Sequence, residues 1–216
     1  MTDGPGGSRT VIVVAKEPVA GSVKTRLCPP CTPVEAATLA ESALADTLEA
    51  VDRARVDRRV LVLDGQPGDW LPAGFEILPQ RGGPFAERLD RAWLDAVGGR
   101  PGCTVQIGMD TPQITSTLLD GALDRLAVVP SVIGPAPDGG WWALGLREHL
   151  PGLFDGVPMS AADTCARQEA RLAVLVGTAP ERLTLLQDVD HIADARAVAT
   201  LAPDTRFARA VVEIDR

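Results

Sequence analysis

The run from Thr10 to Ala15 limits the fold most, because it is an unbroken apolar stretch of mostly β-branched residues, Thr-Val-Ile-Val-Val-Ala. A strand with one face in water would alternate polar and apolar residues. A continuous apolar run is instead typical of a strand that is covered on both faces of a parallel sheet. The chain is therefore expected to be an α/β protein with helices on both sides of a sheet.

Short apolar runs and helical periods alternate along the rest of the chain. Apolar residues recur every three or four positions from Pro33 to Ala54, and Thr32 with Glu35 has the spacing of a capping box. Further helices are expected at Phe85–Val97, Leu118–Leu126, Ala161–Leu172 and Ile192–Leu201, and further strands at Val60–Leu63, Phe75–Leu78, Val105–Ile107, Ser131–Gly134, Trp141–Leu146 and Leu183–Leu186. This order predicts a three-layer α/β/α sandwich with a mostly parallel sheet, in which the strand from Trp141 runs antiparallel.

Length and composition favour one globular domain. The chain has 216 residues, of which 45% are hydrophobic and 23% charged. We expect a flexible N-terminus at 1–9, a single domain at 10–203 and a peripheral C-terminal tail at 204–216. The apolar run that follows the polar N-terminus is too short for a signal peptide or a membrane span, and the four cysteines show no disulfide or zinc pattern. A cytoplasmic protein is expected, and its net charge of -8 disfavours nucleic acid as a partner.

Asp110 is the main candidate for metal binding. Residues 105–112 read Val-Gln-Ile-Gly-Met-Asp-Thr-Pro, a short apolar run that Gly108 ends. Asp110 would therefore stand at the carboxyl end of a strand, where open α/β sheets bind ligands. Asp188 and Asp190 follow a later apolar run, and a spacing of two on an extended segment puts both side chains on one side. Three carboxylates favour Mg²⁺ or Mn²⁺, although each of them could instead cap the helix that follows.

The loop after the first strand is a candidate phosphate site. Residues 16–27 read Lys-Glu-Pro-Val-Ala-Gly-Ser-Val-Lys-Thr-Arg-Leu and have neither a helical nor a strand period. Backbone N–H groups at Gly21 and the charges of Lys24 and Arg26 could wrap the phosphates of a nucleotide. The spacing of a P-loop is absent. The alternative is that Lys16, Lys24 and Arg26 are solvated loop charges.

Four motifs occur in a fixed order: Val-Val-Ala-Lys-Glu-Pro-Val-Ala-Gly-Ser-Val-Lys-Thr-Arg-Leu, Ile-Gly-Met-Asp-Thr-Pro, Gly-Pro-Ala-Pro-Asp-Gly-Gly-Trp-Trp and Asp-Val-Asp. In them the chain resembles, from about Thr10 to Leu201, the DUF2064 family of glycosyltransferase-like proteins, which have the GT-A fold of nucleotide-diphospho-sugar transferases. It is also similar to the 2-phospholactate guanylyltransferases, which share the Lys-Thr/Ser-Arg-Leu loop, the strand-end Asp and the late Asp-x-Asp.

The resemblance implies roles for the donor side of the site. Ala15, Lys16 and the loop through Lys24 and Arg26 would hold the base and phosphates of the nucleotide. Asp110 would be the metal aspartate of the GT-A fold, and the Asp188-Val189-Asp190 segment would complete the metal site. Asp110, Lys24 and Arg26 would therefore be the catalytic groups.

The resemblance also implies an acceptor side, lined by Asp138, Gly139 and Gly140. The family usually has Tyr at the position of Trp141, Trp at the position of Met159, and Thr or Ser at the position of His191. Trp141 could stack on an acceptor ring, and the alternative is that it packs in the core. His191 could serve as a ligand or base, and Arg88 could reach a phosphate. The simpler expectations are that His191 caps a helix and that Arg88 faces solvent.

Two reactions fit these expectations. The first is metal-dependent glycosyl transfer from a nucleotide-diphospho-sugar to a small-molecule acceptor. The second is nucleotidyl transfer, in which an NTP is coupled to a phosphorylated small molecule and pyrophosphate is released. A non-catalytic nucleotide-binding protein is a third possibility. The sequence does not specify the base, the sugar, the acceptor or the oligomeric state.

Overall fold

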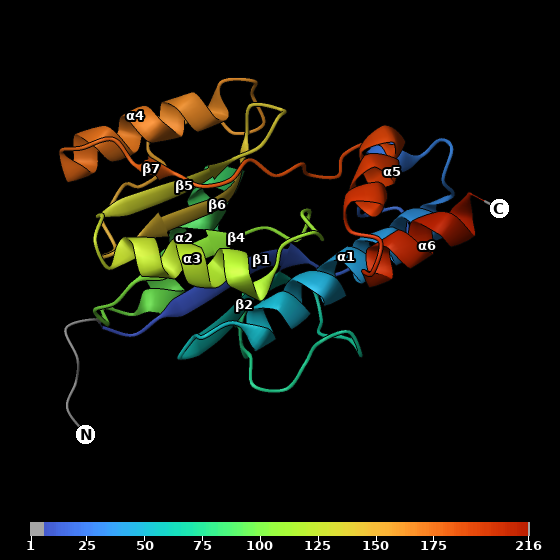
Figure 1. Cartoon of the computed structure of the whole chain (residues 1–216), viewed down its shortest axis with the longest axis horizontal. Helices are drawn as coiled ribbons and strands as arrows, with labels where there is room; N and C mark the ends of the chain where they lie inside the picture. Colours follow the sequence, from blue (N-terminus) through green and yellow to red (C-terminus); the bar gives the residue numbers. More distant parts are fainter. Residues whose placement is uncertain (1–6, 216) are drawn as a thin grey trace.

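A single seven-stranded sheet forms the centre of the computed structural model, which describes residues 7–215 (Figure 1). Its strands are β1 Thr10–Lys16, β2 Arg58–Asp64, β3 Glu76–Pro79, β4 Thr104–Ile107, β5 Ser131–Pro135, β6 Trp141–Leu146 and β7 Glu181–Arg182. They are ordered β3-β2-β1-β4-β6-β5-β7. All pairings are parallel except those of β6, which runs antiparallel to both β4 and β5. The predicted sheet, with its one antiparallel strand, is confirmed.

Helices cover both faces of this sheet, which confirms the three-layer architecture. Helices α1 (Pro33–Arg53) and α3 (Ser116–Leu126) pack on one face, and α2 (Phe85–Val97) and α4 (Thr164–Val176) pack on the other. Strand β1 explains the arrangement, because Val11 and Val13 belong to the α1/α3 core and Ile12 and Val14 to the α2/α4 core. Paired with β2 and β4, β1 is the central strand that its unbroken apolar sequence predicts.

Local sequence signals set the start of α1 as expected. The backbone N–H of Glu35 donates to the Thr32 hydroxyl at 3.3 Å, and the Glu35 carboxylate accepts from the Thr32 N–H at 2.7 Å. This capping box satisfies two backbone donors that the first turn of a helix leaves without partners. Helix α1 therefore starts at Pro33, shortly after the loop that carries the predicted phosphate site.

The last predicted strand is wrong in its position. Strand β7 contains only two residues, Glu181 and Arg182, and the segment Leu183–Leu186 lies outside it. The backbone of Leu183 still donates to Ile133 at 2.8 Å, but Leu185 is 56% exposed. The apolar run continues from the edge strand β7 and stays beside β5 through single backbone bonds, and no further strand of the described chain covers its other side.

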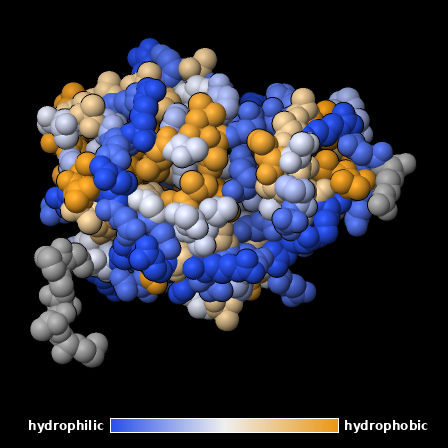
Figure 2. All heavy atoms as spheres, in the orientation of Figure 1, coloured by the Kyte–Doolittle hydropathy of each residue, from blue (hydrophilic) through white to orange (hydrophobic). Residues whose placement is uncertain are grey.

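The predicted peripheral tail is also wrong, because residues 206–214 form a docked helix. Helix α6 (Arg206–Ile214) packs on α1 and on α5 (Ile192–Leu201), at the end of the molecule away from the sheet (Figure 1). Phe207 is only 1% exposed, and its backbone N–H donates to the Asp46 carboxylate of α1 at 2.8 Å. The alternation of apolar and charged residues in this segment is an amphipathic helical period that sequence analysis overlooked. Figure 2 shows apolar atoms interspersed with polar ones over this end of the molecule.

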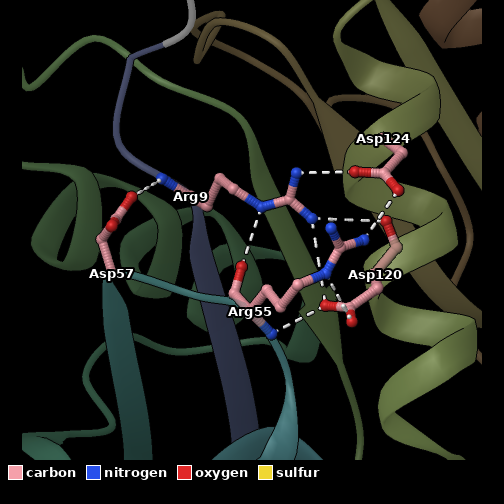
Figure 3. Close-up of polar contacts among 5 residues, drawn as sticks. All are labelled: Arg9, Arg55, Asp57, Asp120 and Asp124. Atoms are coloured by element: carbon pink, nitrogen blue, oxygen red, sulfur yellow. Dashed lines mark hydrogen bonds and ion pairs between the residues drawn. The ribbon is translucent and has the colours of Figure 1, made fainter. Parts of the chain in front are cut away.

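A network of charges lies at the end of the sheet where β1 begins, which is the amino end of that strand (Figure 3). The Arg9 guanidinium lies 2.8 Å from the Asp124 carboxylate of α3. Arg55, just after α1, pairs with both Asp120 and Asp124 at 3.0 Å. Residues 1–6 of the predicted flexible N-terminus lie outside the described residues, whereas Arg9 is held by these contacts and by the Asp57 carboxylate. The network therefore ties the start of β1 to α1 and α3 on one face of the sheet. The site lies at the other end of the strands.

Among the residues described, none of the helices is both long and apolar enough to cross a membrane.

Replacing Phe207 tests whether α6 is part of the core. Phe207→Ala removes a fully buried ring, and such changes cost about 3–5 kcal/mol of unfolding free energy. For a chain of this size we expect the melting temperature to fall by about 10 °C. Val212→Ala is the matched control, because Val212 lies on the same helix and is 53% exposed. Equal melting temperatures for the two variants would contradict the docking of α6.

Candidate functional site

A cavity of about 510 Å³ opens at the carboxyl end of the parallel strands. It is lined from β1 by Val14, Ala15 and Lys16, from β4 and the turn after it by residues 106–111, from β6 by Trp141 and Trp142, and from α2 by Phe85, Arg88 and Leu89. Asp138, Gly140, residues 159–162, Thr164, Asp188 and Asp190 complete the lining, together with Arg26, Asp64, Gln80 and Ala136. This is the edge at which α/β sheets bind ligands.

The three predicted metal carboxylates reach this cavity from two distant segments. Asp110 follows β4 by three residues, and its backbone C=O accepts the N–H of Val189 at 2.9 Å. That single backbone bond places Asp188 and Asp190, on either side of Val189, beside the end of β4. The structure thus brings the three side chains together around one cavity, as the sequence predicts.

Lys24 lies among these carboxylates. Its ammonium Nζ is 2.7 Å from Asp110 Oδ1 and 3.8 Å from Asp190 Oδ1, and it donates to the backbone C=O of Val189. The Lys24 side chain is only 10% exposed, and Arg26 contacts the second oxygen of Asp190 at 2.6 Å. Both loop cations are therefore ion-paired with the acidic residues, but only Lys24 is largely buried, because the Arg26 side chain stays solvated at 64% exposure.

Backbone conformation in the loop contributes to this placement. Two non-glycine residues among residues 7–215 have a positive φ, Lys24 at 48° and Ser160 at 58°. Both border the site, since Lys24 lines a depression of about 290 Å³ that shares Lys16, Arg26, Asp110 and Asp190 with the main cavity, and Ser160 lines the main cavity itself. Such conformations are uncommon for residues that have a side chain, and they concentrate at functional sites.

The residues present fit a divalent cation, although they do not enclose one alone. Among residues 7–215, no three His, Cys, Asp or Glu side chains are gathered tightly enough to hold a metal ion by themselves. The Lys24 ammonium, however, already holds a positive charge between Asp110 and Asp190, which is the place that a cation would take. Mg²⁺ commonly binds one or two carboxylates and takes its other ligands from water and substrate phosphates. An open set of carboxylate oxygens is therefore suitable.

Asp188 is the most perturbed of the three carboxylates. Burial, together with the nearby negative charges of Asp138 and Asp190, raises its pKa to about 6, against the lowering effect of Lys24. Near neutral pH, ionisation of Asp188 therefore lowers the free energy of unfolding of the protein. A cation that bound beside it would remove this cost, because it would favour the charged form of the carboxyl.

The predicted acceptor side is a tight turn between β5 and β6. The Asp138 carboxylate accepts the backbone N–H of Gly140 at 2.7 Å, which closes the turn. Gly139 has a φ of 90°, and a Cβ atom there would lie 2.0 Å from the Ala162 carbonyl oxygen, so only glycine fits. Asp138 and Gly140 line the cavity, whereas Gly139 shapes the turn from outside it.

The two tryptophans that follow face opposite sides of the sheet, as expected for neighbours in a strand. Trp142 is 3% exposed in the α1/α3 core, and its indole N–H donates to the Thr184 carbonyl at 2.9 Å. Trp141 faces the α2/α4 side, lines the cavity and stacks on Phe154 with ring centroids 6.2 Å apart. Both tryptophans line the cavity, but Trp141 is the more exposed of the two and is thus more accessible to a ligand.

The remaining predicted site residues separate into two groups. Ala15 and Lys16 line the cavity at the end of β1. Gly21 is exposed, lines neither depression and supplies a left-handed turn with a φ of 79°. It shapes the loop and forms no wall of the cavity. His191 is exposed, and its backbone N–H donates to the Asp194 carboxylate at 2.7 Å at the start of α5.

Sequence analysis missed several lining residues. Asp64 ends β2 as Asp110 follows β4, so the same strand-end rule could have found it. Gln80, just after β3, donates its amide to the Ala15 carbonyl at 2.8 Å and so connects two strand ends. Arg88 lies on the cavity wall, contrary to the simpler expectation that it faces solvent, because the first turn of α2 starts at the ligand-binding edge of the sheet.

Solved structures that resemble this chain define the class of fold. A protein from Desulfovibrio desulfuricans G20, provisionally named a nucleotide-diphospho-sugar transferase, is 24% identical, with a TM-score of 0.86 over 96% of this chain and 95% of that one. A Mycobacterium tuberculosis H37Rv protein in complex with manganese is 19% identical, with a TM-score of 0.52 over 88% and 97%. The 2-C-methyl-D-erythritol 4-phosphate cytidylyltransferase of Thermus thermophilus is 16% identical, with a TM-score of 0.55 over 91% and 99%. The chain has the α/β fold of nucleotide-diphospho-sugar transferases.

The family follows from the sequence itself. The model of the DUF2064 family, described as an uncharacterized protein conserved in bacteria, matches residues 40–161, which is more than half of the chain. The chain therefore belongs to the DUF2064 family, and the resemblance drawn from its four motifs is confirmed. No curated protein matches the chain in sequence.

The pKa of Asp188 gives a testable effect of pH on stability. The folded pKa of about 6 exceeds the ordinary value of 3.8, so ionising Asp188 destabilises the folded state above about pH 6, and this cost disappears below about pH 4. Asp188→Asn should therefore raise the metal-free melting temperature at about pH 7.5, by about 2–4 °C for each kcal/mol of relieved cost, and should leave it unchanged at about pH 4. Asp69→Asn, in an exposed loop, is the control. A lower melting temperature for Asp188→Asn at the higher pH would contradict the assignment.

Proposed function

We propose that this protein is a metal-dependent transferase that uses a nucleotide-activated donor, and that it transfers a sugar from a nucleotide-diphospho-sugar. The observation that carries the proposal is the convergence of Asp110, Asp188, Asp190 and Arg26 at one cavity, with Lys24 paired to Asp110 in the depression beside it. Carboxylates that can hold a divalent ion, beside cations that can neutralise phosphate, are what a diphosphate donor requires. The fold of nucleotide-diphospho-sugar transferases supports the same class of donor.

In this proposal Asp110 and Asp190, with Asp188 beside them, would hold Mg²⁺ or Mn²⁺, and water and donor phosphate would supply the remaining ligands. When bound, the ion would supply electrostatic stabilisation of the negative charge that develops on the departing nucleotide. Lys24 would exchange its contact with Asp110 for a contact with donor phosphate, since a cation at Asp110 would repel the ammonium. Arg26 would bind phosphate from the rim of the cavity, where its side chain is 64% exposed.

The reaction itself would join an acceptor oxygen to the anomeric carbon of the sugar. The bond from that carbon to the diphosphate would break, the acceptor would lose a proton, and a nucleoside diphosphate would leave. Trp141, which lines the cavity on the α2/α4 side, would contact the acceptor, and the turn at Asp138 and Gly140 would border it.

Nucleotidyl transfer is the second candidate, and the pair of loop cations favours it. A triphosphate carries more negative charge than a diphosphate for Lys24 and Arg26 to offset, and a structurally similar CMP:2-keto-3-deoxy-manno-octonic acid synthetase is complexed with CTP, which supports a triphosphate donor in this fold. An acceptor phosphate would then attack the α-phosphorus in line and release pyrophosphate. The carboxylates and the loop would have the same tasks in both reactions.

Incubation with Mg²⁺ or Mn²⁺ and a panel of nucleotide sugars and NTPs separates the candidates. Release of free nucleoside diphosphate from a nucleotide sugar supports glycosyl transfer, and release of pyrophosphate from an NTP supports nucleotidyl transfer. A non-catalytic nucleotide-binding protein would give neither product, and its nucleotide affinity would be the same in EDTA.

Asp110→Asn tests the metal site. Loss of this carboxylate should abolish the Mn²⁺-dependent part of nucleotide binding, measured by calorimetry with and without EDTA, because one ionised ligand is removed. The melting temperature should change little, since the side chain of Asp110 is 45% exposed. The control is Asp69→Asn, the same substitution in an exposed loop. A large loss of stability with unchanged metal dependence would mean that Asp110 is a structural cap.

Lys24→Gln should change two affinities in opposite directions. Loss of the Lys24 ammonium removes a cation that competes with Mn²⁺ for the carboxylates, so Mn²⁺ alone should bind several-fold tighter. Nucleoside diphosphate should bind about tenfold weaker at a fixed saturating Mn²⁺ concentration, because a charge-assisted contact to phosphate is lost. Lys24→Arg keeps the charge and should behave like the wild type toward Mn²⁺. Unchanged nucleotide affinity in Lys24→Gln would remove the loop from the donor site.

A further inference from the structure

Arg88 is a charged side chain on the cavity wall that has no ion-pair or hydrogen-bond partner among residues 7–215. It lies on the first turn of α2, and none of the residues from 7 to 215 forms an ion pair or a side-chain hydrogen bond with it. Its Nε atom is buried and unpaired. Arg91, one turn further along the same helix, pairs with Glu87 at 3.0 Å instead. A partly buried guanidinium that forms no ion pair is costly unless a ligand supplies the missing acceptor.

A second unpaired donor lines the same part of the cavity. The indole N–H of Trp141 is buried and finds no acceptor among the residues described. Trp141 packs against the core formed by α2 and α4, the same side of the sheet from which Arg88 projects. Lys16 follows Val14 by two residues on β1, so its side chain leaves the strand on that side as well, and it has no ion pair in the described chain.

The surroundings hold this group of donors in place. Gln106 of β4, fully buried, accepts the Trp93 indole N–H at 2.9 Å and donates its own amide to the Leu89 carbonyl at 3.2 Å. These bonds fix the first turns of α2 on the sheet directly beside Arg88. The Arg88 guanidinium also lies 5.5 Å from the centre of the Phe85 ring, which supports it from one side.

The cavity therefore has two electrostatically different parts. Around Asp110 and Asp190 the loop cations are already paired with carboxylates. On the α2/α4 side, Arg88 and Trp141 have donor atoms without a partner, and Lys16, which also borders the depression beside Asp110, adds a positive charge that forms no ion pair in the described chain. Several N–H donors converging from different elements match a group with several negatively charged oxygens.

We propose that Arg88, together with the Trp141 indole and Lys16, forms a subsite for a phosphoryl or carboxylate group of a substrate. The identity of that substrate rests on the proposed function, and the group can belong to the donor or to the acceptor. A group on the acceptor would make this a transferase for negatively charged small molecules. A group on the donor would extend the phosphate site beyond the loop.

Metal-free binding of inorganic phosphate tests the subsite without requiring turnover. In EDTA, calorimetry should detect phosphate binding to the wild type, at least tenfold weaker binding to Arg88→Gln, and partial recovery in Arg88→Lys. Arg91→Gln is the matched control on the same helix and should bind like the wild type. Phosphate should also change the tryptophan fluorescence of the wild type, and Trp141→Phe should lose that change. This second readout does not depend on the folding of any Arg88 variant.

A saturating nucleoside diphosphate with Mn²⁺ then identifies the source of the group. If it comes from the acceptor, phosphate still binds to the nucleotide complex, and Arg88→Gln leaves nucleotide affinity unchanged. If it comes from the donor, the nucleotide displaces phosphate, and Arg88→Gln weakens the nucleotide about tenfold. Absence of phosphate binding to the wild type, or equal binding to the wild type and Arg88→Gln, overturns the subsite. Phosphate binding without nucleotide binding would overturn the proposed function and leave the subsite standing.

Discussion

The backbone bond between Val189 and Asp110, together with the ammonium of Lys24, holds the candidate site together. Carboxylates from two distant segments repel one another when they meet, and the raised pKa of Asp188 records its burial and that repulsion. A main-chain bond fixes the two segments at no cost in charge, and one lysine supplies positive charge between Asp110 and Asp190. The cluster of Asp110, Asp188 and Asp190 can therefore form before any ligand binds. The positions of the loop, of the end of β4 and of the start of α5 all depend on this contact.

The same cavity receives side chains from both faces of the sheet. Alternation along β1 directs neighbouring side chains to different faces, and the pair Trp141 and Trp142 at the start of β6 divides in the same way. Acidic groups and their paired cations occupy one part, whereas unpaired donors from α2 and β6 occupy the other. A substrate that spans the two parts would meet paired charges at one end and unpaired donors at the other, and this difference would orient it.

The sequence predicts most of the fold because its signals are local. The β-branched run of β1 and the capping box at Thr32 each depend on neighbouring residues, and both are confirmed. Strand-end position also places Asp110 correctly. Contacts between distant residues are what sequence reasoning lacks: the partner of Lys24, the edge position of Leu183–Leu186 and the burial of Phe207 against Asp46 depend on where other segments lie. The position of Arg88 was mispredicted for the same reason. Its place in the helical period indicates a face in solvent, whereas the first turn of α2 borders the cavity.

The docking of α6 on α1 has a consequence for synthesis. The Asp46 carboxylate on α1 binds a backbone N–H that lies 161 residues later in the chain. During translation, α1 is made well before α6, so the apolar surface that Phe207 covers stays open until the segment between the two helices and α6 itself have left the ribosome. A nascent chain of this kind exposes an apolar patch on α1 throughout that interval, and the patch closes only when α6 docks.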